Sequence, residues 1–459
     1  MINEIKIWVN KVKESTKTNY YQNACTFNID IKYKSNISSN IREGWHKLGA
    51  INLPTIYEDL YLLSLIVFSV DKRVSRSHFS DAWTRKLHVN IPVINIDIWN
   101  NVQNDINNML SYLSGDEWII EFRKSEPDSV YKSPKVRSVA RPYFLNNIEA
   151  VSLFSGGLDS FCGAYKLLAQ NKSTLFVGFQ EYGKLKGLQQ ALINTLKNSF
   201  QDCYCELFSF SAVARALFLP EGVNLKTENT SRSRSFLFLC GALTVAGIIG
   251  KDTPVYIPEN GFIGLNLPMT ASRLGSCSTR TTHPYFLKMF NSILDKIGVH
   301  HKIINPYAFS TKREMVNELK DIPSFRQSIH KTISCSHPCN GRWDRYPVPQ
   351  NCGYCYPCLI RQSSLLDIEL PEEEYGKNIF KSEYIKSTSN AKHSDLVDLL
   401  TSVVSAINST DEELKRRISA TGRLNSDEIE KFLRLYKSTI KDLKELLSKS
   451  DDFSKIIGN

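Results

Sequence analysis

The sequence predicts an α/β protein with a doubly wound parallel sheet, a mixed α+β module before it and a helical tail after it. From residue 149 onwards short apolar runs alternate with helical patterns, which is the order of elements in successive βαβ units. At 459 residues the chain exceeds the usual size of one domain. We therefore expect an N-terminal module with its linker at residues 1–145, the sheet domain at 146–375 and a helical C-terminal extension at 376–459.

The N-terminal module combines strand and helix patterns without a motif that indicates chemistry. Residues 24–34 alternate between apolar and polar as in a strand, residues 57–72 fit an apolar helix or a buried strand, and residues 97–124 fit a helix followed by a strand. The stretch from Lys124 to Pro142 is polar and contains prolines, and we interpret it as the linker.

Five short apolar runs predict the strands of the sheet domain. They cover residues 150–154, 174–179, 204–210, 254–259 and 302–306. In doubly wound sheets ligands bind beyond the carboxyl ends of the strands. Residues directly after these runs are therefore the first candidates for a site.

The tail from about Ser382 has the pattern of packing helices. Thr410–Glu413 and Asn425–Glu428 resemble capping boxes at helix starts. Apolar residues then recur at helical spacing, namely Ile429, Phe432, Leu433, Tyr436, Ile440, Leu443 and Leu447. We expect these helices to pack without contributing chemistry.

Net charge and composition restrict the possible classes of function but do not select one of them. The formal net charge of +10 suits an anionic ligand, but the basic residues are scattered, so we do not expect direct nucleic-acid binding. The opening residues lack a secretory signal, and the apolar run from Phe236 to Gly250 is too short and too rich in glycine for a membrane span. We expect a cytoplasmic protein in which that run is a buried helix. The 11 cysteines argue against a disulfide framework in such a compartment.

The loop Ser155–Ser160, with the sequence SGGLDS, predicts a phosphate site. It follows an apolar strand and turns into a helix at about Leu158, so free backbone N–H groups and a positive helix end point at a ligand. Gly156 and Gly157 leave room for a phosphate, and the two serine hydroxyls add donors. A carboxylate beside phosphates is repulsive unless it holds a cation, so we assign Asp159 to Mg²⁺. The loop is not a Walker loop, because no Gly-Lys-Ser/Thr follows.

A cysteine cluster near the end of the sheet domain predicts a structural zinc site. Cys352, Cys355 and Cys358 form two overlapping C-x-x-C units, a spacing that wraps thiolates around one tetrahedral ion. The fourth ligand is open between Cys335, Cys339 and His337, and we favour Cys335. A closed four-thiolate site stabilises its segment and does not activate water.

The loop and the cysteines together resemble one family. SGGLDS after an apolar strand resembles the pyrophosphate (PP) loop of ATP pyrophosphatases, which have a HUP-like fold. With the downstream cysteines and Arg361, the stretch from about Glu149 to Leu370 resembles the 7-cyano-7-deazaguanine synthase (QueC) family. The resemblance implies that ATP activates the carboxylate of 7-carboxy-7-deazaguanine as an acyl-adenylate and that an amine then displaces AMP to form an amide. In the synthase a second ATP serves to dehydrate the amide to a nitrile.

The terminal segments and the stretch from Ser278 to Phe286 resemble more closely the QueC-like proteins of the Qat anti-phage defence system. This resemblance implies a protein partner from the same defence operon. Two features depart from the ordinary synthase. Cys335 lies further along the chain from Cys352 than the first cysteine of the synthases usually does, and residues 180–187 lack the histidine that often follows Tyr-Gly. The amine acceptor, the oligomeric state and the choice between amide and nitrile product stay open.

Other residues near the predicted strand ends are candidates for weaker roles. Phe179 and Gln180 end the second strand, where this class of sheet holds adenine. Ser231, Arg232 and Arg234 stand at a helix start, where an arginine neutralises leaving pyrophosphate. The remaining candidates are Glu259 and Asn260 for the guanine-like edge of a deazaguanine, and Arg280, His283 and Lys312 for anion contacts. We expect Asp159, Ser160, Arg232 and Lys312 to act in catalysis, and Arg234, Glu259, Asn260 and Arg280 to bind substrate.

Three other functions compete with an ATP-dependent, carboxylate-amine ligase of phage defence. One is the ordinary synthase itself. Another is a PP-loop enzyme that modifies tRNA, which the dispersed charge supports little. The third is a scaffold without catalysis, against which the intact loop Ser155–Ser160 argues.

Overall fold

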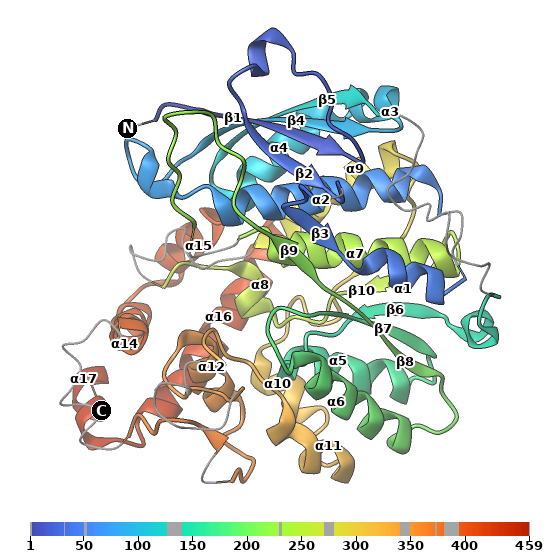
Figure 1. Cartoon of the computed structure of the whole chain (residues 1–459). Coiled ribbons are helices and arrows are strands. Elements are labelled where there is room, and N and C mark those ends of the chain that lie inside the picture. The colour runs from blue at the N-terminus through green and yellow to red at the C-terminus, as the bar shows by residue number, and fades with distance from the viewer. Residues whose placement is uncertain are drawn as a thin grey trace.

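Two sheets with helices between and around them form the protein (Figure 1). The computed structural model describes residues 2–31, 33–49, 53–125, 140–228, 232–269, 280–339, 349–371, 374–380 and 394–458. Most of the predicted linker, Ser231 and the first two residues of the Ser278–Phe286 stretch lie outside the described residues.

The sheet of the sheet domain has five strands in the order β11-β10-β6-β7-β8, all parallel. Their bounds are β6 Ala150–Leu153, β7 Thr174–Phe179, β8 Cys205–Phe210, β10 Val255–Tyr256 and β11 Ile303–Ile304. The five strands predicted from the apolar runs are confirmed, although β10 and β11 are shorter than expected. Because β6 is the central strand, the loop that follows it opens at the middle of the carboxyl edge.

Helices cover both faces of this sheet. Helices α5 (Leu158–Ala169) and α6 (Leu185–Ser199) lie on one face, and α7 (Arg234–Ile249) lies on the other (Figure 1). Helix α7 contains most of the apolar run from Phe236 and is buried along most of its length, as expected. No helix of the described residues is both long and apolar enough to cross a membrane.

The second sheet belongs mainly to the N-terminal region and has the strand order β5-β4-β1-β2-β3-β9. The bounds are β1 Ile5–Lys11, β2 Cys25–Ile29, β3 Ile37–Ser39, β4 Lys86–Val93, β5 Glu117–Lys124 and β9 Ala212–Ala214. All neighbours pair in parallel except β3 and β9, which are antiparallel. Strand β9 follows β8 in the chain, so the sheet domain supplies an edge strand to the N-terminal sheet.

A buried helix joins the two sheets. Helix α2 (Thr55–Arg73) is the apolar segment predicted as helix or strand, and it packs against α7 between the sheets (Figure 1). One cluster of buried apolar residues extends from the N-terminal sheet through both helices to the five-stranded sheet. The proposed boundary near residue 145 thus divides the chain but not this core. The N-terminal region also holds α1 Ile41–Lys47, α3 Ile96–Asn101 and α4 Gln103–Ser114.

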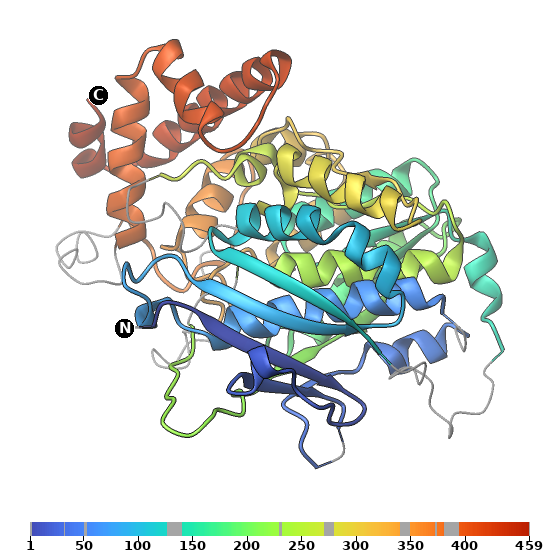
Figure 2. The same cartoon turned by 90° about the horizontal axis from the view of Figure 1, so that it is seen from above.

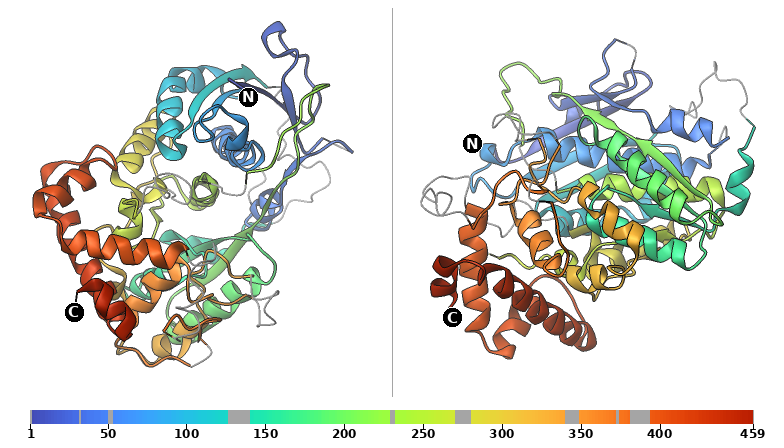
Figure 3. Two further views of the ribbon diagram at one scale, coloured as in Figure 1. Left: turned by 90° about the vertical axis from the view of Figure 1, so that its left-hand side faces the viewer. Right: turned by 90° about the horizontal axis from the view of Figure 1, so that it is seen from below.

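The tail consists of helices, gathered on one side of the molecule in Figures 2 and 3. They are α14 Ser394–Ile407, α15 Asp411–Ser419, α16 Ser426–Leu447 and α17 Asp451–Ile457. Both predicted capping boxes are present, at Thr410 and Asn425. Apolar residues of the tail share a second core with α8 (Gly261–Leu265) and α12 (Tyr356–Ser364), so the tail is packed against the sheet domain.

The remaining helices connect these parts. They are α9 Pro284–Lys296, α10 Lys312–Asn317 and α11 Pro323–Ser328, with short 3-10 helices at Asn19–Tyr21, Arg76–His78, Tyr143–Asn147, Arg280–Thr282 and Ile329–Lys331. The tail also contacts the N-terminal region, because the Tyr112 hydroxyl donates a 2.8 Å hydrogen bond to the carbonyl oxygen of Thr421.

Candidate functional site

The loop between β6 and α5 has a backbone that requires glycine. Gly156 has a φ of +85°, which favours glycine over any residue with a side chain. A Cβ atom on Gly157 would lie 3.3 Å from both the carbonyl oxygen of Ile333 and Oγ of Ser155. Gly156 therefore suits the backbone of the loop, and Gly157 suits the narrow space between Ile333 and Ser155.

Hydroxyl groups shape the inside of the loop. The backbone N–H of Gly157 donates to Oγ of Ser155 at 3.2 Å, and Oγ of Ser160 donates to the carbonyl oxygen of Gly157 at 2.9 Å. The two serine oxygens are 3.2 Å apart. Since Leu158 begins α5, the first N–H groups of the helix point into the same region. Donors and a helix dipole converge here as in an anion site.

Three strand ends meet at Asp159. Nζ of Lys312, from the start of α10 beyond β11, lies 2.9 Å from Oδ1 of Asp159. Asn260, which follows β10, donates to Oδ2 of Asp159 from its backbone N–H at 3.2 Å and from Nδ2 at 2.6 Å. Lys312 is 7% exposed and Asn260 is fully buried. The structure thus brings together three predicted site residues that lie far apart in the sequence.

These contacts bear on the predicted Mg²⁺ site. One carboxylate oxygen of Asp159 is paired with the ammonium group of Lys312 and the other accepts from Asn260. Lys312 therefore already supplies the cation that a carboxylate near phosphates needs. A metal ion at Oδ1 has to displace Lys312. The assignment of Asp159 to Mg²⁺ therefore stays a prediction, and Lys312 is the alternative partner of this oxygen.

Glu259 lies beside this group. Burial raises the pKa of its carboxyl group to about 7, although the Thr282 hydroxyl, which donates to Oε2 at 2.7 Å, acts in the opposite direction. The nearby carboxylate of Asp159 adds to the increase. A carboxyl group that is partly protonated near neutral pH can accept or donate a hydrogen bond. It therefore suits the guanine-like edge of a base, which carries both donors and acceptors.

Two predicted arginines contact other parts of the molecule. The backbone N–H of Arg232 donates to Asp71 at 2.7 Å, and its guanidinium group donates to the carbonyl oxygen of Ser114, both in the N-terminal region. Arg280 donates to the carbonyl oxygen of Tyr112 at 2.9 Å. The structure does not bring these two side chains into contact with the loop residues described above, and their roles stay predictions.

The other predicted contacts are only partly near the loop. The ring of Phe179 is 6% exposed and packs among aromatic rings, including that of Phe210. Gln180 donates from Nε2 to the Ser209 hydroxyl at 2.8 Å. Arg234, at the start of α7, pairs with Glu181 and also acts electrostatically on Glu259.

Two residues that shape the loop were not identified from the sequence. Gln189 of α6 is fully buried and donates from Nε2 to the carbonyl oxygens of Phe154 at 3.0 Å and Ser155 at 3.3 Å. Oγ of Ser334 accepts a 3.1 Å hydrogen bond from the backbone N–H of Leu158. The only signal for Ser334 in the sequence is its position directly before Cys335.

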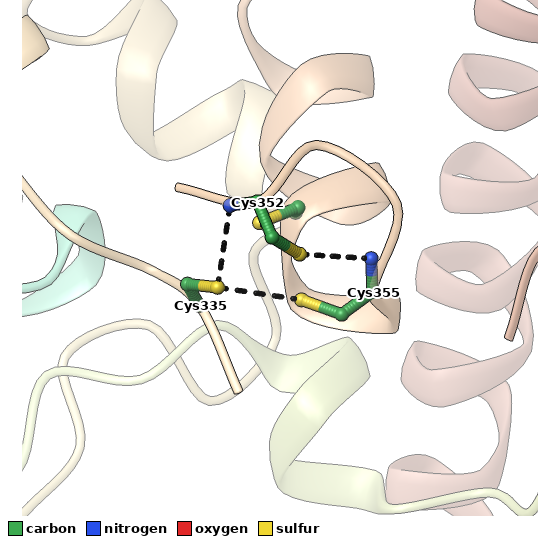
Figure 4. A group of neighbouring side chains, drawn as sticks. Cys335, Cys352 and Cys355 are labelled. Atoms are coloured by element: carbon green, nitrogen blue, oxygen red, sulfur yellow. Dashed lines mark hydrogen bonds between the residues drawn. The ribbon is translucent and has the colours of Figure 1, made fainter. Parts of the chain in front are cut away.

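The four cysteines nominated as zinc ligands come together. The Sγ atoms of Cys335, Cys352, Cys355 and Cys358 all lie within 4.8 Å of one another. Figure 4 shows Cys335 on a separate stretch of chain, facing Cys355 at an Sγ–Sγ distance of 3.8 Å. This is the donor set of a tetrahedral four-thiolate zinc site. Cys339 and His337 are not in this group.

Backbone N–H groups support the sulfur atoms. Cys352 donates to Sγ of Cys335 at 3.4 Å, and Cys355 donates to Sγ of Cys352 at 3.4 Å (Figure 4). The backbone N–H of His337 donates to Sγ of Cys335 at 3.2 Å. Donors of this kind favour the thiolate form that a metal binds.

The cluster rests on a buried ion pair. Nη2 of Arg361, on α12, lies 2.7 Å from Glu374, and Nη1 donates to the Thr332 hydroxyl at 2.6 Å. Arg361 is fully buried. It therefore ties the helix that carries Cys358 to the stretch just before Cys335.

The curated relatives of the chain include two 7-cyano-7-deazaguanine synthases of Leptospira interrogans serogroup Icterohaemorrhagiae, from serovars copenhageni and Lai. Each is 28% identical to this chain over 247 residues, which cover 50% of this chain and 90% of the relative. No protein-family model matches the chain. This distant similarity over half of the chain supports a QueC-like family.

Proposed function

We propose that the protein is an ATP-dependent enzyme that adenylates the carboxylate of a 7-deazaguanine and transfers the acyl group to an amine. The observation that carries the proposal is the convergence of the glycine loop, Asp159, Lys312 and Asn260 at the carboxyl edge of the five-stranded sheet. The similarity to two 7-cyano-7-deazaguanine synthases supports the deazaguanine substrate.

Each group has a role in this reaction. The substrate carboxylate attacks the α-phosphorus of ATP, and pyrophosphate leaves. The loop N–H groups and the ammonium of Lys312 stabilise the charge that accumulates on the phosphates. Asp159 orients Lys312, Asn260 holds Asp159, and Glu259 binds the base. An amine then attacks the acyl carbon, AMP leaves with the bonding electron pair, and the amine loses a proton to solvent. Mg²⁺, when bound with ATP, supplies further charge neutralisation.

We further propose that the amine belongs to a partner protein and that the enzyme serves phage defence, as the resemblance to QatC of the Qat system implies. An acyl-adenylate reacts with any amine that reaches it, so access decides the product. The N-terminal region and the helical tail, which lie outside the QueC-like stretch Glu149–Leu370, supply surface for a partner, whereas ammonia needs none. The α-amine of a chain is favoured, because its pKa near 8 leaves more free base at neutral pH than a lysine near 10.4. We place this reaction in the cytoplasm.

The ordinary synthase is the second candidate, and the 90% coverage of the synthase relatives favours it. In that case the amine is ammonia and the product is the free nitrile.

One assay separates an enzyme that acts on a deazaguanine from one that modifies tRNA. The protein is incubated with ATP, Mg²⁺, an ammonium salt as the amine and either 7-carboxy-7-deazaguanine or tRNA, and AMP and pyrophosphate are measured. We expect AMP and pyrophosphate to be released with the acid and not with tRNA. Release only with tRNA indicates a tRNA-modifying enzyme, and no release with either contradicts the proposed function.

The acceptor needs a second experiment. Partners encoded beside this protein are co-expressed with it, and their intact masses are measured against a culture that carries Asp159→Asn. A mass gain that needs Asp159 supports a protein acceptor. Free nitrile without any mass gain returns the protein to synthase chemistry.

A further inference from the structure

Three consecutive residues connect the phosphate loop to the cysteine cluster. We call residues 333–335 the bridging segment. The backbone N–H of Ile333 donates to the carbonyl oxygen of Gly156 at 3.0 Å, and Oγ of Ser334 accepts from the backbone N–H of Leu158 at 3.1 Å. Cys335 is the next residue, and its Sγ belongs to the cysteine cluster. Cys335 is therefore bonded directly to a residue that contacts the loop.

Ser334 accepts a hydrogen bond from a backbone N–H group of the predicted phosphate site. Leu158 is the first residue of α5, so its N–H has no partner inside the helix and is of the kind that phosphate oxygens take. A serine hydroxyl has two acceptor lone pairs and one hydrogen. Ser334 can thus hold the N–H of Leu158 and still present its own hydrogen to an anion. Its hydroxyl stands with those of Ser155 and Ser160 as a third hydroxyl of the loop.

The cysteine side holds Ser334 from two directions. The backbone N–H of Ser334 donates to Oδ1 of Asn351 at 2.9 Å, and Asn351 directly precedes Cys352. Asn351 is 1% exposed, and its Nδ2 also donates to the carbonyl oxygen of Thr332 at 3.1 Å. Sγ of Cys358 lies 3.7 Å from the carbonyl oxygen of Ser334. Both chain segments that fix Ser334 therefore continue into cysteines of the cluster.

A metal ion determines how firmly this arrangement is held. Four thiolates this close repel one another, whereas a tetrahedral zinc ion holds them together and couples its binding energy to local folding. Zinc bound to Cys335 and Cys352 fixes the residues on either side of Ser334. The hydroxyl of Ser334 then reaches Leu158 with less loss of conformational entropy.

We propose that Ser334 is a positioning residue of the phosphate loop and that zinc in the cysteine cluster strengthens nucleotide binding through it. This inference rests on the ATP site of the proposed function. Because linkage is reciprocal, nucleotide binding strengthens zinc binding by the same factor.

The test measures nucleotide affinity, without turnover. The probe is α,β-methylene ATP with Mg²⁺, and its Kd is measured for the full-length protein with zinc and after zinc is chelated. Three variants accompany the wild type. Ser334→Ala removes the hydroxyl, Ser334→Thr keeps it, and Ser336→Ala removes an exposed hydroxyl two residues away as a matched control. Zinc content and circular dichroism are recorded for every sample.

We expect Ser334→Ala to keep its zinc and to bind the nucleotide about tenfold more weakly, within the range usual for coupled sites. Ser334→Thr and Ser336→Ala should bind as the wild type does. Chelation should weaken the wild type by a similar factor and should weaken Ser334→Ala no further, because the route from the metal to the loop is already broken. Nucleotide should also slow the loss of zinc from the wild type.

Two results overturn the inference while leaving the ATP site intact. One is unchanged affinity in Ser334→Ala, and the other is a further tenfold loss when that variant is chelated. If chelation unfolds the protein, the comparison of Ser334→Ala with Ser334→Thr, which both keep zinc, decides the positioning role. The rate of zinc loss from the wild type then decides the role of zinc, and equal rates with and without nucleotide overturn it. A zinc-loaded wild type that binds no nucleotide overturns the proposed ATP site and this inference with it.

Discussion

Nζ of Lys312 lies 2.9 Å from Oδ1 of Asp159, although the two residues come from helices that follow different strands of the sheet. Both side chains are largely buried, at 7% and 15% exposed. The pair places one cation beside the Ser155–Ser160 loop and holds it with a carboxylate. The position of this ion pair at the loop, more than the identity of either residue, favours a role in chemistry on phosphates.

We expect Asp159→Asn to fold and to lose AMP formation by about 100-fold or more, because the amide no longer holds the cation of Lys312 at the loop. The amide keeps the shape of the carboxylate and its contact with Asn260, so the Tm should fall only moderately. AMP release from ATP in the presence of the deazapurine acid and an ammonium salt measures the loss. Asp367→Asn is the control, since it removes a carboxylate paired with Arg313 outside the site. AMP formation at the parent rate in Asp159→Asn would show that the pair has no catalytic role.

The loop is tested by Gly157→Val. Gly157 has a φ of −83° and a ψ of 168°, which valine adopts without strain, so the change blocks space without forcing the backbone. The added side chain meets the carbonyl oxygen of Ile333 and the loop hydroxyls, and AMP formation should fall by about 100-fold. Gly183→Val is the control, because nothing lies within 4 Å of a Cβ at Gly183. Equal activity of the two variants contradicts a phosphate at this loop.

The cysteine cluster predicts about one zinc ion per chain. Cys355→Ser and Cys335→Ser should each lose the metal and lower the Tm, because each removes one of four ligands whose binding energy folds the segment. Cys339→Ser should keep both the zinc and the Tm, since Cys339 lies outside the cluster. Metal analysis by mass spectrometry and thermal unfolding make the comparison. Zinc retained in Cys335→Ser and lost in Cys339→Ser would reverse the assignment of the fourth ligand.

Glu259 predicts a pH dependence of stability. Burial raises the pKa of its carboxyl group from 4.5 to about 7, so the folded protein binds more protons than the unfolded chain between these values. The free energy of unfolding should therefore decrease as the pH rises from about 4.5 to 7. Glu259→Gln removes this contribution, and its Tm should exceed that of the wild type at pH 8 but not at pH 4.5. Parallel pH profiles of the two proteins would contradict a raised pKa at Glu259.

Local patterns in the sequence determined the elements and the two motifs. The five strands of the sheet, the buried helix α7 and the capping boxes at Thr410 and Asn425 depend on residues a few positions apart. The glycines of the loop and the spacing of Cys352, Cys355 and Cys358 are local in the same sense. Periodicity, turn chemistry and ligand spacing act within one or two turns of chain, so a single sequence contains them in full.

Only the tertiary structure decided which distant residues meet. Arg232 carries the residue type expected of a phosphate ligand, yet its backbone N–H is bonded to Asp71 of the N-terminal region. Strand β9 leaves the sheet domain to complete the N-terminal sheet, and Ser334 reaches the loop from the cysteine segment. These contacts join residues separated by more than 150 positions in the cases of Arg232 and Ser334. They depend on how apolar faces pack and on which buried polar groups find partners, and neither is written in the spacing of neighbouring residues.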